Sequence, residues 1–139
     1  MSKTLGSLSV GAKIEVPVLS AYQSRFGSKI VFKIADKNHS GYPSNSVTLI
    51  TEKIIQLMCF DAKEPTTKNT HVTYNPYTSW AGFLAMLDPK FVAELMETTL
   101  TVVKSSTDGG SYETFKAKMF LASTTEVGLA NENNIAEGT

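Results

Sequence analysis

Apolar side chains recur at every second position near the start of the chain. Residues 12–19 place Ile14, Val16 and Val18 on one side of an extended backbone and mostly polar side chains on the other. This alternation predicts a β-strand with one buried face. Because Pro17 cannot donate a hydrogen bond to a neighbouring strand, we expect this strand to lie at a sheet edge or to bend there.

Two further runs complete a predicted meander. Residues 29–36 are rich in β-branched and aromatic side chains, as in a central strand, and residues 46–51 alternate again. The segment 37–45 between them consists of residues that favour turns, and residues 22–27 form a polar connection. Residues 1–52 are therefore expected to form a small three-stranded antiparallel sheet.

The period of the apolar positions becomes helical in the middle of the chain. The run 51–58 fits a short helix, although its brevity leaves a strand open. Apolar residues in 78–87 recur at i, i+3, i+4 and i+7, the stripe of a helix that faces a core. Asp88 followed by proline is typical of a helix N-cap, which predicts a second helix ending at 97–99.

The last third predicts a hairpin and a short helix. Residues 100–104 and 112–121 read as two strands, and the Asp-Gly-Gly sequence at 108–110 is a strong turn signal between them. A Ser-Thr-Thr-Glu capping box opens a short helix over 123–131. Residues 132–139 have little apolar surface to bury and are expected to fray.

These patterns together predict one α+β domain over residues 1–139. Its 139 residues, 42% of them hydrophobic, suffice for one packed core, and no apolar run approaches the roughly 18 residues of a membrane span. The first residues carry no signal-peptide-like apolar stretch. The predicted parts are a β meander (1–52), a region of two or three short helices (53–99) with a polar loop (61–77), a β-hairpin (100–121), a short helix (123–131) and a tail (132–139).

The charges cancel over the whole chain but not within its halves. Residues 1–70 hold nine basic and five acidic side chains, and residues 71–139 hold four and eight, so the halves carry about +4 and −4. The simple interpretation is a soluble surface; the sharper alternative is a basic partner on the acidic half. Arg25 is the only arginine, which disfavours sequence-specific nucleic-acid binding, because bidentate recognition of guanine prefers arginine.

No constellation of residues predicts catalysis, a metal site or a cofactor. Cys59 is the only cysteine, which excludes an intrachain disulfide and fits a small buried residue in a cytoplasmic protein. His39 and His71 lie far apart without metal-ligand spacing. Glu94 and Glu97 are expected on the solvated side of a helix rather than across a cleft.

The polar loop and the aromatic residues beside it are the predicted partner-binding site. Tyr74, Tyr77 and Trp80 follow a stretch that includes Lys68 and Glu64. Loops concentrate binding residues, and clustered aromatics are typical of protein-binding or sugar-stacking patches. A loop anchored by its own aromatic residues would have the same sequence, so both interpretations stay open.

Several phrases of the sequence resemble a known family. They are SLSVG (7–11), KIADKNH (33–39), TLITEKII (48–55), FDAKEP (60–65), TTLTVVK (98–104) and FLASTTEVGL (120–129). In this order they resemble an uncharacterised domain of minor structural, tail-associated proteins of phages and prophages of Gram-positive bacteria. The resemblance implies a C-type-lectin-like fold in complete members and no catalytic motif.

The chain also departs from that family. Members carry an "RQWLN"-type helix after the polar loop, which is shortened here between residues 71 and 80, and they continue past residue 137 into a β-rich half. We therefore expect a reduced, stand-alone version of the domain.

Three functional hypotheses follow. The first is a non-catalytic, phage-derived protein that binds a protein partner in the host cytoplasm, for example as an inhibitor of a defence system such as a CRISPR nuclease (an anti-CRISPR). The second, implied by the resemblance, is a virion or tail-associated structural or receptor-binding module. The third, an enzyme, is disfavoured. None of the three involves direct sequence-specific nucleic-acid binding or a membrane.

Overall fold

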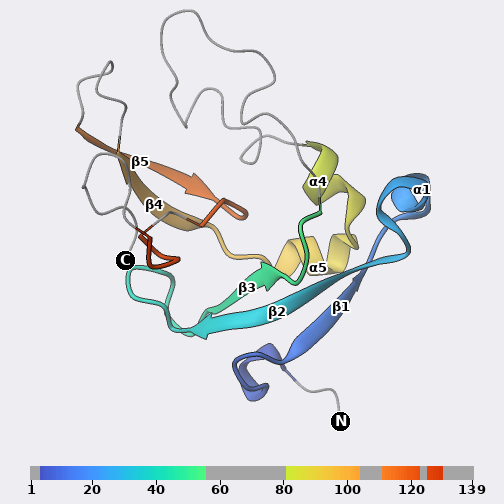
Figure 1. Cartoon of the computed structure of the whole chain (residues 1–139), viewed down its shortest axis with the longest axis horizontal. Coiled ribbons are helices and arrows are strands. Elements are labelled where there is room, and N and C mark those ends of the chain that lie inside the picture. The colour runs from blue at the N-terminus through green and yellow to red at the C-terminus, as the bar shows by residue number, and fades with distance from the viewer. Residues whose placement is uncertain (1–3, 56–80, 104–110, 123–124, 130–139) are drawn as a thin grey trace, which may run out of the picture. The chain divides into compact units, whose positions relative to one another are not determined.

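The part of the chain that the structure describes is mixed α+β, with two small antiparallel sheets and a few short helices. The computed structural model describes residues 4–55, 81–103, 111–122 and 125–129 (Figure 1). The chain divides into two compact units. The first comprises Met1–Met58 with Trp80–Met96, and the second comprises Cys59–Ser79 with Glu97–Thr139.

The first unit contains the predicted three-stranded meander. Strands β1 (Lys13–Pro17), β2 (Lys29–Lys37) and β3 (Val47–Thr51) lie in the order β1-β2-β3, and both neighbouring pairs are antiparallel (Figure 1). The prediction that Pro17 belongs to an edge strand is confirmed, because β1 pairs only with β2 among the named strands. The β2–β3 register shifts between Ile34 and Asp36, which marks a bulge.

Short helical turns occupy the connections that flank β1. They are η1 (Leu5–Ser7), η2 (Ser20–Tyr22) and α1 (Gln23–Phe26). The sequence predicted only a polar connection between β1 and β2, because four residues are too few to show a helical period. The Gln23 side-chain amide donates to the Val18 carbonyl over 2.7 Å, and Gly27 ends the helix with a φ of 77°.

Helices α4 (Ala81–Met86) and α5 (Pro89–Glu94) contribute to the core of the first unit. The corner between them pairs with the end of β1, since Leu87 forms an antiparallel bridge with Val18. The rings of Phe91 in α5 and Phe32 in β2 lie 5.5 Å apart. Among the described residues of this unit, the buried apolar side chains are Val16, Val18, Ile30, Phe32, Ile34, Phe83, Met86 and Leu87.

The predicted capping of α5 is confirmed, and its predicted length is wrong. Asp88 is the N-cap, and its side chain accepts a hydrogen bond of 2.8 Å from the amide of Lys90. The helix ends at Glu94 instead of continuing to 97–99, because Leu95 is already extended and Thr98 begins a strand. Consecutive threonines are stiff at χ1 and favour that extended backbone.

The second unit contains the predicted hairpin. Strands β4 (Thr98–Val103) and β5 (Tyr112–Ala117) pair antiparallel, from Thr98 opposite Ala117 to Val103 opposite Tyr112. The predicted turn at 108–110 lies outside the described residues. The strand expected over 112–121 ends at Ala117, and Phe115 and Ala117 are buried as the alternation predicted.

Two other helix predictions differ from the structure. Residues 52–55 are not helical: the amide of Glu52 donates to the Val31 carbonyl over 2.9 Å, which prolongs the β2–β3 ladder. Of the short helix predicted over 123–131, residues 123–124 and 130–131 lie outside the described residues. Residues 125–128 form a turn, closed by a hydrogen bond from the Gly128 amide to the Thr125 carbonyl. Gly128 has a φ of 76°, a left-handed conformation that stops a helix. Within the described part of the chain, no helix is long and apolar enough to cross a membrane.

Candidate functional site

The predicted partner-binding residues lie outside the described part of the chain. They are Glu64, Lys68, Tyr74, Tyr77 and Trp80, together with the rest of the polar loop 61–77. Cys59 and His71 also lie there. The binding site predicted at this loop therefore stays a prediction.

The described residues present a different candidate surface on the three-stranded sheet. The two faces differ because β2 alternates strictly: Ile30, Phe32 and Ile34 are buried, while Lys29 and Lys33 belong to the opposite face. Pairing aligns the residues of that opposite face into rows across the strands. We call this the outer face and define it as Lys13, Glu15, Lys29, Val31, Lys33, Ile50 and Glu52.

Two rows of the outer face carry opposite charges. One row runs from Glu15 through Val31 to Glu52, in which Glu15 faces Val31 and the Glu52 amide donates to the Val31 carbonyl. The next row runs from Lys13 through Lys33 to Ile50. Two lysines therefore lie directly opposite each other beside a row that holds two carboxylates.

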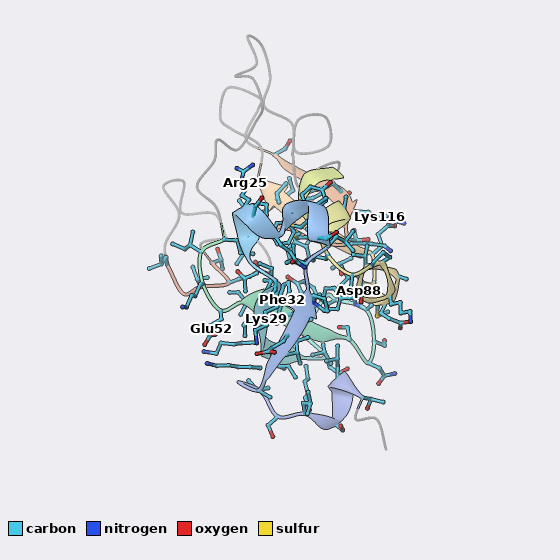
Figure 2. All side chains as sticks on the ribbon, turned by 90° about the vertical axis from the view of Figure 1, so that its right-hand side faces the viewer. Arg25, Lys29, Phe32, Glu52, Asp88 and Lys116 are labelled. Atoms are coloured by element: carbon cyan, nitrogen blue, oxygen red, sulfur yellow. The ribbon has the colours of Figure 1, made fainter. Side chains whose placement is uncertain are left out.

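Ion pairs connect the charges of the outer face. Lys13 in β1 forms an ion pair with Glu52, which follows β3, so this contact reaches over the central strand. Lys29 Nζ lies 2.6 Å from Glu15 Oε1. Figure 2 shows Glu52 and Asp88 on opposite sides of Phe32, in keeping with an outer face turned away from the helical corner. Glu52 is partly buried and the other three side chains are exposed, so these pairs organise the surface more than they stabilise the fold.

The electrostatic environment of Glu52 shows that lysines surround it. The pKa of the Glu52 carboxyl is lowered, chiefly because Lys13 hydrogen-bonds to it and further because Lys13, Lys33 and Lys53 place positive charge nearby. Lys33 and Lys53 make no ion pair with a described carboxylate. The charges of Lys33 and Lys53 are therefore not neutralised by a described carboxylate, since Glu52 pairs with Lys13.

Apolar side chains lie among these charges. Val31 is half-buried within the glutamate row, and Ile50 retains 49% of its surface in the lysine row. A patch with an apolar part and a charged margin is typical of protein–protein interfaces. The outer face thus combines two aliphatic side chains, Val31 and Ile50, with charged ones.

A second polar cluster lies at the β2–β3 connection. Asp36 Oδ2 is 2.7 Å from His39 Nδ1, and Asp36 Oδ1 accepts the Lys37 amide at 2.7 Å. These two contacts, the histidine first, lower the pKa of the Asp36 carboxyl. The His39 ring also lies 4.6 Å from the ring of Tyr42. An aspartate can orient an imidazole for proton transfer in this way, and the same contacts brace a tight turn.

Sequence reasoning identified neither cluster as a site. The alternation of 12–19 predicted a strand with one buried face, but only the register of the three strands shows which lysines and glutamates meet on the other face. The Asp36–His39 spacing of three residues was the available signal for the second cluster. Among the described residues, no group of three or more histidine, cysteine, aspartate or glutamate side chains is placed to hold a metal ion.

Comparison with known proteins identifies a family of undetermined role. Residues 45–139 match the family described as "Domain of unknown function (DUF6273)". No curated protein and no solved structure matches the chain. The matched region begins in the β2–β3 connection and includes β3, α4, α5, β4 and β5. Because this region is more than half of the 139 residues, the chain belongs to the DUF6273 family.

Proposed function

We propose that this chain acts without catalysis, by binding a protein partner through the outer face. The observation that carries the proposal is Ile50, a large apolar side chain that is 49% exposed among charged neighbours. Such a residue adds little to the core of its own unit, and burying it against a partner is favourable by roughly 25 cal/mol for each Å² of apolar surface removed from water. The flanking ion pairs would form the polar margin of the contact.

The Asp36–His39 pair is assigned to structure in this proposal. Its carboxylate bonds the Lys37 amide as well as the imidazole, so the pair closes the connection between β2 and β3. The enzyme alternative would require this imidazole to act on a substrate. A His39→Gln variant that keeps full partner binding would support the structural role.

The resemblance described above suggests two specific forms of the proposal. In the first, the chain is a phage-derived inhibitor that binds a protein of the host cytoplasm, such as a defence nuclease. In the second, it is a tail-associated module of a virion with a reduced C-type-lectin-like fold. Mass spectrometry of purified phage particles separates them, because a virion component is present in particles and a cytoplasmic inhibitor is absent.

Site-directed photo-crosslinking tests the surface itself. A photoreactive phenylalanine analogue at Ile50 should give a light-dependent protein adduct in the lysate of a Gram-positive host. The same analogue at Lys90, an exposed residue of α5, serves as the matched control and should give none. Adducts of equal yield at both positions, or at neither, would contradict the proposed surface.

A second pair of variants compares the outer face with the polar loop predicted from the sequence. Tyr74→Ala/Tyr77→Ala removes the aromatic residues of that prediction, and Ile50→Ser removes the exposed apolar group of the outer face. Our proposal expects the adduct or pulled-down partner to be lost in Ile50→Ser and retained in the tyrosine variant. The reverse result would move the binding site to the loop.

A further inference from the structure

We propose that the partner presents an acidic protein surface, which Lys33 and Lys53 contact directly. The inference rests on the proposed function and deepens it, because it specifies the chemistry of the partner at the same outer face. It depends on which charges of that face are already neutralised within the chain.

The charge balance of the outer face is positive. Lys53 is exposed and follows Glu52 directly in the chain, so we count its charge with that of the outer face. The face and Lys53 together hold four lysines (Lys13, Lys29, Lys33 and Lys53) and two glutamates, Glu15 and Glu52, which gives a net charge of 4 − 2 = +2. Each glutamate is paired to a lysine, Glu15 to Lys29 and Glu52 to Lys13. The excess charge therefore resides on two particular side chains.

Lys33 is the central one of these two. It lies in the middle strand, directly opposite Lys13 in β1 and Ile50 in β3. Like charges directly opposite each other in a sheet repel, which is unfavourable. Lys13 contacts one carboxylate, that of Glu52, and Lys33 and Lys53 also place positive charge near it. A carboxylate supplied by a partner would relieve this repulsion while Ile50 becomes buried beside it.

The composition of the face favours protein over nucleic acid. Two carboxylates within the patch would repel phosphates, and its apolar groups Val31 and Ile50 are aliphatic, so they cannot stack on bases. The only arginine, Arg25, lies outside the face in α1, over the ring of Phe26. The outer face is therefore better suited to an acidic protein surface than to nucleic acid.

Binding to defined polymers tests the partner's chemistry without a known partner. Wild-type chain should bind immobilised poly-L-glutamate at low salt, and raising the salt should release it, since screening shortens the reach of exposed charges to roughly 10 Å at 0.1 M. Lys33→Glu/Lys53→Glu changes the face from +2 to −2 and should weaken this binding by about tenfold or more. The affinity of Lys33→Gln/Lys53→Gln for poly-L-glutamate should lie between those of the wild type and the charge-reversed variant.

Matched controls assign the effect to the outer face. Lys90→Glu/Lys118→Glu makes the same change in net charge at exposed positions elsewhere and should bind poly-L-glutamate as the wild type does. Circular dichroism should show the same thermal transition for every variant that is compared. Equal loss in this control, absence of binding to poly-L-glutamate, or stronger binding to a thymidine oligonucleotide would overturn the inference.

The crosslinking arm distinguishes failure of this inference from failure of the proposed function. If the Ile50 position yields a protein adduct whose amount is unchanged in Lys33→Glu/Lys53→Glu, the chain binds protein there but the acidic partner surface is wrong. If no adduct forms from Ile50, the proposed function itself fails. Loss of the adduct in the charge-reversed variant, with retention in the Lys90/Lys118 control, supports both.

Discussion

The contact between Phe32 and Phe91 should contribute a measurable coupling energy. Phe32 is 8% exposed in the central strand, and its ring centroid lies 5.5 Å from that of Phe91 in a tilted arrangement. This separation is within the 4.5–7 Å range in which aromatic pairs add about 0.5–1.5 kcal/mol beyond the area they bury. The pair therefore reports directly on the packing of α5 against the sheet.

A double-mutant cycle measures this coupling. Phe32→Leu should lower the free energy of unfolding by about 1–2 kcal/mol, since leucine leaves part of the ring volume unfilled. Phe91→Leu should cost less, because Phe91 is only half-buried. The double variant should be more stable than the sum of the single effects predicts, by about 1 kcal/mol, because the second substitution has no ring contact left to remove.

Urea unfolding followed by far-UV circular dichroism provides the free energies. Phe26→Leu combined with Phe91→Leu is a suitable control, because the described partner of the Phe26 ring is the Arg25 guanidinium, 5.2 Å away. The effects of these two control substitutions on the free energy of unfolding should add. Additivity of Phe32 and Phe91 to within about 0.3 kcal/mol would refute the packing of α5 on β2.

Three further predictions follow from other features. Asp88→Ala removes the N-cap hydrogen bond to the Lys90 amide and should lower the free energy of unfolding by about 1 kcal/mol in urea titrations, whereas Asp88→Asn should recover most of it. Because the pKa of Asp36 is lowered in the folded chain, its contribution to stability should be complete above the unfolded value of about 3.9 and should disappear as pH falls through the lower folded value. Asp36→Asn should therefore be less stable than wild type at pH 6, with a difference that shrinks as the pH falls below about 3.9, and a difference that stays constant with pH would contradict the assignment. A fragment limited to residues 45–139 should lack a stable first sheet, because β3 would lose its partner strand β2. Cooperative unfolding of this fragment, with the far-UV circular dichroism of the whole chain, would contradict that prediction.

Local signals explain which parts of the fold were predictable. The alternation around Ile14 and Val16 predicted a strand, Pro17 predicted that it lies at a sheet edge or bends, and the Asp-Pro pair at Asp88 predicted the start of α5. All three depend on residues adjacent in sequence. The end of α5 was not predictable in this way, because Thr98 pairs with Ala117, nineteen positions later, and this pairing draws the preceding residues into an extended backbone.

The candidate site was predictable only in part. The alternation of 12–19 predicted a strand with a polar face, but it could not show that Lys13 reaches Glu52 across the central strand. That contact depends on the register of three strands and on the Glu52 amide, which bonds the Val31 carbonyl just past the end of β3. The sequence of 51–58 fits a short helix and leaves a strand open, so it could not predict this bond. The aromatic residues predicted to bind a partner lie in the part of the chain that the structure does not describe.

The corner between α4 and α5 also limits how far the free edge of β1 can pair with a strand of another molecule. The carbonyl of Pro17 accepts the Asp88 amide at 3.0 Å, and the Leu19 amide donates to the Met86 carbonyl at 2.8 Å, so one end of this edge is already occupied within the chain. The remaining end carries Lys13 and Glu15, and charged side chains discourage a foreign strand from joining a sheet. Although β1 is an edge strand, it is thus protected at both ends against templating aggregation with further copies of the protein.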